Sequence, residues 1–267
     1  MAYIDEENGE YVVVDLVKDA VLHRLKGPVT TYMHIALSPD GTRLVTRVRN
    51  DMLQIWNVDT GESERVVKTV NRAFCSFSPD GTKIAVTYLG LGTAHILSHT
   101  GDTLKTLEAQ ETILYSHPFW SEDGATVYVR ENARISAWNV ETGECIRTIP
   151  YLQPIETSGS LYFFPGGKVL SVMDGTNLVY FWEPDAPRLL ATLMLLPKDR
   201  AVLFTPQGHF HGPEGVEEAL VYVALTDSGE QLTLTPAEFT AKYGWKNDPA
   251  RVQLDGITSG GTAAGAK

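Results

Sequence analysis

Cysteine and long apolar runs are both scarce in this 267-residue sequence, which contains only Cys75 and Cys145. Two thiols cannot build the disulfide framework of a small secreted domain, and free thiols are typical of a reducing compartment. No apolar run reaches the roughly 18–20 residues that a membrane-spanning helix needs. Residues 1–7 have no basic segment followed by an apolar one, so we expect no signal peptide. These absences predict a cytoplasmic protein.

Positive charge is also in short supply, because 22 Lys and Arg stand against 33 Asp and Glu, leaving a net charge of −11. A field of that sign repels phosphate backbones and anionic lipid headgroups, so we expect neither a nucleic acid nor a membrane as partner. Apolar residues make up 43% of the chain, which is enough for a sizeable core and excludes wholesale disorder. The length allows one large domain or two small ones.

A four-residue motif recurs along the chain. Ser38–Gly41 returns as Ser78–Gly81 and, with one change, as Ser121–Gly124, and weaker copies end at Gly167 and Gly208. The closing glycines are therefore separated by 40, 43, 43 and 41 residues. A fixed period of this length is the sequence signature of a repeat protein.

Two further marks keep step with this motif. The first, 14 or 15 residues after the closing glycine, is a tryptophan or an isoleucine; the second, five residues later, is a glycine or a proline. The first set comprises Trp56, Ile96, Trp138 and Trp182, and the second Gly61, Gly101, Gly143 and Pro187. Three marks in register over four copies predict four complete structural repeats.

The repeated unit has the chemistry of connected β-strands. In Ser-Pro-Asp-Gly, proline presets φ, aspartate bonds to nearby backbone and glycine accepts a positive φ, so the motif predicts a turn between antiparallel strands. Residues between the turns are β-branched or aromatic at many positions and show no helical period. In the first repeat the predicted strands are His34–Leu37, Arg43–Val48, Met52–Asn57 and Ser63–Lys68. Four strands in about 40 residues are typical of a β-propeller blade, with the tryptophans wedged between blades.

The turns, together with Ile55-Trp56-Asn57, Ala137-Trp138-Asn139 and Phe181-Trp182-Glu183, resemble the WD-repeat (WD40-like) family in its degenerate bacterial form, over residues 3–208. The Gly-His pair and the aspartate that form a hydrogen-bonded tetrad in that family have no counterparts in this sequence. The resemblance implies an all-β propeller of four-stranded antiparallel blades that acts as a scaffold for protein–protein interaction.

The two ends of the repeat region leave the number of blades open. Residues 3–26 have the pattern of second, third and fourth strands without a first one, whereas Ala201–Thr205 has the pattern of a first strand. If these segments pair, they close a ring of five blades without exposed edges. Alternatively, residues 209–235 complete a sixth blade around the turn Asp227–Gly229. A third reading makes the chain a piece of a seven-bladed parent.

Beyond residue 212 the period is lost, and we expect three segments: a propeller over 1–212, a strand and helix cap packed on it over 213–254, and a disordered tail over 255–267. Thr235–Glu238 is a capping box with proline at the first helical position, and it predicts a short helix that ends at Gly244. Glycine, serine and alanine dominate the tail.

Catalytic and metal-binding patterns are few. We interpret Cys75 as a small buried residue and Cys145 as part of an outer strand. His209 and His211 have a spacing that can hold Zn²⁺ on a strand, but no further ligand accompanies them, so we interpret them as turn-flanking residues. The predicted innermost strands contain no Asp or Glu, which argues against the converging carboxylates of a glycosidase. We therefore predict no catalytic residue, no metal and no cofactor.

The remaining candidate is a surface, formed by loops that join second to third strands and loops that lead into first strands. Its residues are Tyr32, Arg49, Asn50, Asp51, Arg72, Tyr88, Arg130, Glu131, Asn132 and Asp174. Arg and Tyr often anchor interfaces, and Arg49, Arg72 and Arg130 suit an acidic segment of a protein or peptide partner, although ordinary solvated loops explain the same residues. We predict a non-catalytic scaffold. The alternatives are a lactonase-like or hydrolytic propeller enzyme, and a C-terminal remnant of a longer multidomain WD-repeat protein.

Overall fold

The structure is a computed structural model, and it describes residues 1–5, 7–27, 34–49, 51–70, 72–113, 117–132, 134–150, 161–164, 168–173, 177–183 and 188–252. The chain forms two compact units, Met1–Phe163 and Phe164–Lys267. Both are built from antiparallel sheets, and the described part of the chain has one α-helix. The prediction of an all-β protein with a short C-terminal helix is confirmed. No described helix has the length and apolar character needed to cross a bilayer.

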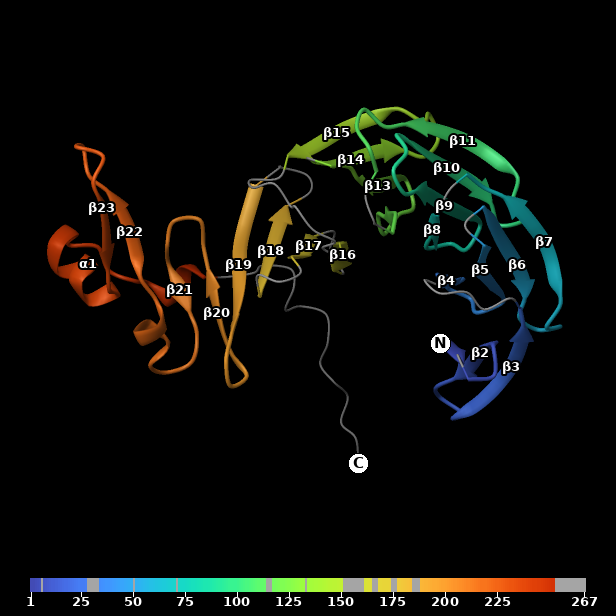
Figure 1. Cartoon of the computed structure of the whole chain (residues 1–267), viewed down its shortest axis with the longest axis horizontal. Helices are drawn as coiled ribbons and strands as arrows, with labels where there is room; N and C mark the ends of the chain where they lie inside the picture. Colours follow the sequence, from blue (N-terminus) through green and yellow to red (C-terminus); the bar gives the residue numbers. More distant parts are fainter. Residues whose placement is uncertain are drawn as a thin grey trace. The chain divides into compact units, whose positions relative to one another are not determined.

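Four consecutive sheets make up the first unit, and they follow one another along an arc with β4 and β8 on its inner side and β7 and β11 on its outer side (Figure 1). The first sheet has three strands and the other three have four strands each, ordered from the inside outwards as they occur in the chain. The strands are β1 (Ala2–Asp5), β2 (Glu10–Asp15) and β3 (Ala20–Lys26); β4 (Ile35–Leu37), β5 (Arg43–Arg49), β6 (Met52–Asn57) and β7 (Ser63–Lys68); β8 (Ala73–Phe77), β9 (Lys83–Tyr88), β10 (Thr93–Ser98) and β11 (Thr103–Glu108); and β12 (Phe119–Trp120), β13 (Thr126–Arg130), β14 (Arg134–Asn139) and β15 (Cys145–Pro150).

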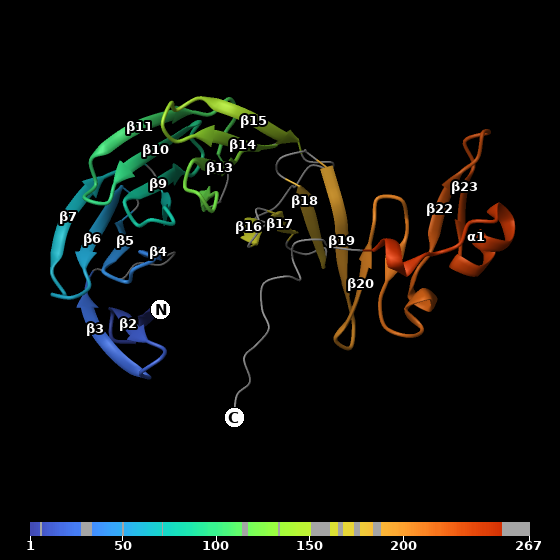
Figure 2. The same ribbon diagram turned by 180° about the vertical axis from the view of Figure 1, so that it is seen from behind.

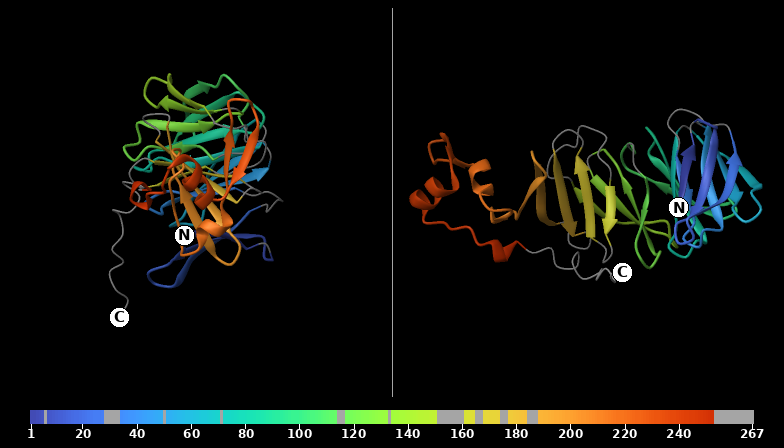
Figure 3. Two further views of the ribbon diagram at one scale, coloured as in Figure 1. Left: turned by 90° about the vertical axis from the view of Figure 1, so that its left-hand side faces the viewer. Right: turned by 90° about the horizontal axis from the view of Figure 1, so that it is seen from below.

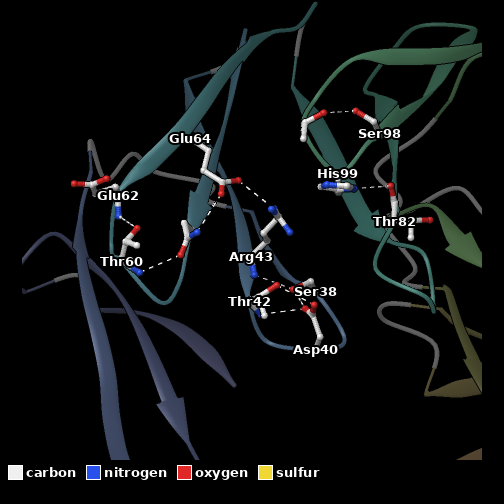
Figure 4. Close-up of polar contacts among 12 residues, drawn as sticks. Ser38, Asp40, Thr42, Arg43, Thr60, Glu62, Glu64, Thr82, Ser98 and His99 are labelled. Carbon is white, nitrogen blue, oxygen red and sulfur yellow. Dashed lines mark hydrogen bonds and ion pairs between the residues drawn. The ribbon is translucent and has the colours of Figure 1, made fainter.

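The repeated Ser-Pro-Asp-Gly motif forms the predicted turns. Gly41 has a φ of +75°, and its N–H donates to the carbonyl of Ser38. Asp40 Oδ1 accepts hydrogen bonds from Ser38 Oγ at 2.6 Å and from the N–H of Thr42 at 3.0 Å, as Figure 4 shows. The same bonds recur around Asp80, where they lower the pKa of the carboxyl to about 2. The same local hydrogen bonds therefore stabilise the turn at both copies of the motif.

Two tryptophans of third strands, Trp56 and Trp138, lie between neighbouring sheets, as the sequence predicts. Trp56 is 5% exposed and belongs to an apolar cluster that also contains Tyr11 and Leu25 of the first sheet. Trp138 packs in the same way against Ile96 and Leu107 of the preceding sheet. In these two sheets a tryptophan of the third strand thus packs against the preceding sheet, an arrangement consistent with propeller blades.

A β-bulge marks the equivalent position in five of the six sheets that the described residues form. The register between third and fourth strands shifts at Ile55/Trp56, Ile96/Leu97, Ala137/Trp138 and Phe181/Trp182. In the first sheet the same shift occurs at Val13/Val14, between β2 and β3. Strand β2 is therefore a third strand and β1 a second strand, which confirms that residues 3–26 supply the second to fourth strands without a first.

The second unit contains a sheet with the strand order β16-β17-β18-β19-β20-β21 and a separate hairpin. The boundary between the units falls within its first strand. These strands are β16 (Leu161–Phe164), β17 (Lys168–Met173), β18 (Leu178–Glu183), β19 (Arg188–Leu196), β20 (Arg200–Phe204) and β21 (Phe210–His211).

Strand β20, for which the sequence left ring closure and a sixth blade open, pairs with strands of the second unit. It pairs with β19 along its whole length and with β21 at Leu203 and Phe204. The physical reason is the connection that precedes it, because Lys198 and Asp199 both adopt positive φ and reverse the chain tightly onto β19. The number of blades stays a prediction.

The C-terminal elements are η1 (Val216–Ala219), the hairpin of β22 (Tyr222–Leu225) and β23 (Gln231–Leu234), helix α1 (Pro236–Tyr243) and η2 (Pro249–Arg251); Figures 2 and 3 show α1 beside the hairpin. The predicted capping box of α1 is present: Thr235 Oγ1 accepts from the N–H of Glu238, whose carboxylate accepts from the N–H of Thr235. The helix ends at Gly244 in the left-handed region, as predicted.

This segment is held to β21 by an aromatic stack and an amide. Trp245 stacks on His209 with ring centroids 5.0 Å apart. The Asn247 side chain accepts from the N–H of Phe210 at 2.8 Å and donates to its carbonyl at 2.9 Å, in the manner of a neighbouring strand. The domain limits at 212 and 254 stay predictions, and the predicted tail, 255–267, lies outside the described residues.

Candidate binding surface

The inner strands β4, β8 and β12 line a cavity of about 570 Å³ in the first unit. Its walls are mostly apolar because the three inner strands contain no charged residue. The lining residues are His34, Ile35, Ala36, Leu37, Cys75, Ser76, Phe77, Pro79, His117, Pro118, Phe119 and Trp120. Ser76 ties two of the walls together, since its hydroxyl donates to the carbonyl of Pro118 at 2.6 Å and its own carbonyl accepts from Trp120 Nε1 at 3.2 Å.

Two of the residues that line this cavity are histidines in contact with each other. The rings of His34 and His117 lie 4.4 Å apart, and Nε2 of His34 is 2.9 Å from the backbone nitrogen and 2.7 Å from the backbone oxygen of Cys75. Burial, followed by the nearby His117, lowers the pKa of His34 to about 3. Loss of solvation and the charge of Arg47 also lower the pKa of His117. His34 is therefore neutral at physiological pH and acts as a backbone-bonded core histidine.

We expect His34 to make the protein less stable in mild acid. The unfolded ring has a pKa of about 6.5, so between pH 6.5 and 3 the unfolded chain binds a proton that the folded chain excludes. At pH 5 this linkage costs about 2 kcal/mol. Urea unfolding of His34→Gln, whose amide can still bond to Cys75, should show a smaller loss between pH 7.5 and 5 than the unmodified chain. Equal losses in both proteins would contradict this assignment.

Neither cysteine has the surroundings of a nucleophile. Cys75 is 1% exposed, and burial raises the pKa of its thiol to about 12, far from the thiolate that nucleophilic attack requires. Cys145 begins the outer strand β15, and its Sγ lies 3.4 Å from the carbonyl of Arg147. Both residues occupy the positions that the sequence predicts.

His209 and His211, which are two residues apart in the second unit, differ in burial. His209 is 6% exposed, and its Nδ1 accepts the N–H of Asp248 at 3.0 Å while Nε2 lies 3.3 Å from Arg251. His211 is exposed. Among the described residues no group of three or more His, Cys, Asp or Glu side chains is arranged to hold a metal ion. Both nitrogens of His209 thus contact the segment after α1.

Three of the predicted surface residues are buried: Tyr88, Arg130 and Glu131 are 2%, 1% and 0% exposed. The Tyr88 hydroxyl lies 2.7 Å from Nδ1 of His95, and burial raises the pKa of the Tyr88 phenol. Buried side chains offer no contact area to a partner, so the structure does not support docking through these three residues.

Glu131 is the centre of a polar cluster that sequence reasoning missed. Its carboxylate accepts from Ser136 Oγ, from Arg134 Nε at 3.0 Å and from the N–H of Glu111 at 3.0 Å. The bonds join the β13–β14 turn to the segment after β11. The spacing of Glu131 and Arg134, three residues apart across a tight turn, was the available signal, but it does not reveal the distant Glu111.

The other predicted residues are only partly described. Asp51 is exposed in the β5–β6 connection, and Arg72, which directly precedes β8, is half-buried. Their carbonyls accept from Thr69 at 2.7 Å and from Leu89 at 2.9 Å, so both lie at the same end of their sheets. Arg49 closes β5, with only its backbone described, and Tyr32, Asn50 and Asp174 lie outside the described residues. We call this end of the sheets of the first unit the rim.

No family model and no curated protein matches the chain. Among solved structures, 1445 chains match, so the fold is widespread and does not by itself assign a function. One of them is hydrazine synthase from Kuenenia stuttgartiensis, with a TM-score of 0.53 and 17% identity over 76% of this chain. The chain spans 65% of that structure's length, less than two thirds. This likeness concerns the fold alone.

Proposed function

We propose that the chain is a non-catalytic β-propeller scaffold of the WD-repeat type, which binds a protein or peptide partner at the rim. The observation that carries this proposal is the repetition of one four-stranded sheet with a wedged third strand, because it fixes equivalent connections at one end of successive sheets. Loops held by a rigid framework are the usual location of binding residues.

The rim chemistry favours an acidic partner segment. Arg72 and Arg49 belong to neighbouring sheets and lie at the same end of them, whereas the chain as a whole carries a net charge of −11. Arginine forms bidentate hydrogen bonds with carboxylates, and positive charge at the rim of an acidic molecule attracts an acidic segment locally. Arg130 has no part in this proposal because its side chain is buried.

The test is an affinity capture with the intact chain and with Arg49→Ala/Arg72→Ala, followed by titration of each recovered protein in purified form. Removing two interface arginines should weaken binding at least tenfold. The matched control is Lys18→Ala/Lys83→Ala, which removes the same charge at the opposite end of the sheets and should bind like the unmodified chain. Equal affinity of the arginine variant and the unmodified chain would contradict docking at the rim.

A further inference from the structure

The second unit contains a cavity of about 670 Å³, a volume in the range of ligand sites. Its walls come from three segments of that unit: the loop from β21 to η1, helix α1, and the segment that follows α1 (Figure 1). All three lie in the continuously described range 188–252. The lining residues are Phe210, His211, Gly212, Pro213, Glu214, Gly215, Val216, Glu217, Pro236, Ala237, Thr240, Ala241, Asn247 and Pro249.

These walls are fixed by packing within the second unit. The side-chain oxygen and nitrogen of Asn247 both bond to the backbone of Phe210, at 2.8 and 2.9 Å. Val216 of η1 is 2% exposed and belongs to the same apolar cluster as Phe210. On the helix, Phe239 stacks on Tyr222 of the hairpin, with ring centroids 4.6 Å apart. The cavity is therefore built by contacts that hold its three segments in place.

The helical wall offers apolar surface without free charge. The residues that α1 contributes to the lining are Pro236, Ala237, Thr240 and Ala241. The hydroxyl of Thr240 already donates to the carbonyl of Pro236 at 2.9 Å. The positive end of the helix is compensated by the carboxylate of Glu238, which accepts from the N–H of Thr235 at 2.8 Å. This wall thus suits hydrocarbon groups.

The loop wall has the opposite character. It carries two carboxylates, Glu214 and Glu217, and no lysine or arginine lines the cavity. Both side chains are exposed, and neither has an ion-pair partner among the described residues. Unpaired negative charge beside an apolar wall favours a ligand that carries cationic groups next to hydrocarbon ones.

We propose that this cavity binds an extended segment of another protein in which lysine or arginine alternates with an apolar residue. Successive side chains of an extended chain point to opposite sides, so the cationic ones reach Glu214 and Glu217 while the apolar ones pack on Ala237 and Ala241. The site takes the opposite charge to the rim and lies in the other unit, so it does not rest on partner binding at the rim.

The experiment titrates the intact chain with a blocked, fluorescently labelled hexapeptide, Ala-Leu-Lys-Leu-Lys-Ala. Glu214→Gln/Glu217→Gln should weaken its binding about tenfold. The matched control is Glu218→Gln/Glu230→Gln, which removes the same charge from exposed positions outside the cavity and should bind like the unmodified chain. A peptide with glutamine in place of both lysines should bind weakly and equally to all three proteins. If both variants weaken the lysine peptide alike, the attraction comes from net charge and the proposal is overturned.

Two further measurements locate the bound peptide. Ala241→Leu fills the cavity from an exposed helical position without changing charge, so it should weaken the lysine peptide about tenfold and leave the unfolding midpoint in urea unchanged. By NMR, nuclear Overhauser effects should join the leucine methyl groups of the peptide to the methyl group of Ala237. Arg49→Ala/Arg72→Ala should bind the peptide normally, which separates this site from the rim.

Three results would contradict the proposal. The first is normal peptide binding by Ala241→Leu, and the second is a bound peptide whose leucines contact residues outside the cavity. The third is a free chain in which the Ala237 methyl group contacts the first unit, residues 253–267 or a second copy, because the protein would then fill its own cavity.

Discussion

Replacing Trp56 by alanine is expected to lower the free energy of unfolding by about 3–5 kcal/mol. The indole is 5% exposed and fills the space between the first and second sheets, beside Tyr11, Leu25 and Val58. Removing it leaves a cavity between two sheets that cannot collapse independently, so both the lost transfer energy and the cavity contribute. Urea unfolding followed by circular dichroism measures the change.

Trp56→Phe and Trp138→Phe separate the contribution of packing to stability from that of hydrogen bonding. Trp56 Nε1 donates to Thr46 Oγ1 at 2.9 Å, whereas Nε1 of the buried Trp138 has no hydrogen-bond partner among the described residues. Trp56→Phe should therefore cost about 1 kcal/mol more than Trp138→Phe, the usual net value of a buried hydrogen bond. A Trp56→Ala protein that unfolds within about 1 kcal/mol of the unmodified chain would show that the sheets do not depend on this wedge.

Gly101→Ala is expected to destabilise the protein by about 3 kcal/mol, from two separate causes. Gly101 has a φ of +91°, which an L side chain rarely adopts. A Cβ placed there would lie 2.6 Å from Val67 Cγ2 and 3.0 Å from Ile55 Cδ1, both in the preceding sheet. The substitution therefore strains the turn and also pushes two sheets apart.

Gly41→Ala is the matched control because it tests the backbone cause alone. Gly41 has a φ of +75°, and nothing lies within 4 Å of an added Cβ. We expect a loss of about 1 kcal/mol, from conformational strain without a clash. If the two variants unfold at the same urea concentration, the side chains beside Gly101 make room for the added Cβ without a loss of stability, and the expected clash is absent.

The sequence predicted the local features of this protein well. Positive φ at Gly41, the third-strand position of Trp56 and the capping box at Thr235 all follow from chemistry within a few residues. The same holds for the strand limits, since β6 and β7 coincide with the predicted ranges. Turn types, caps and strand periods depend on neighbours in the chain, and a repeat allows each interpretation to be checked against the next copy.

The candidate surface was predicted less well, because burial at the end of a strand depends on residues far away in the chain. Glu131 and Tyr88 occupy loop-flanking positions where a polar residue usually faces solvent. Glu131 is buried where the N–H of Glu111 donates to its carboxylate, and Tyr88 is buried where its hydroxyl lies against Nδ1 of His95 on the adjacent strand. Asp51 keeps the exposure that its position suggests, whereas Arg72 is half-buried.

Pairing of the last strand shows where local information ends. The residues of β20 predict a strand, but they do not specify which neighbouring strand it pairs with, because backbone hydrogen bonds can form with any strand of suitable length. The tight reversal at Lys198 and Asp199 selects β19 in this structure. The spacing of the repeats and their turn chemistry can thus be derived from the order of amino acids, because they are properties of short segments. Which side chains are covered was decided by contacts between strands and sheets, many of them between segments tens of residues apart, since burial arises only when the sheets assemble.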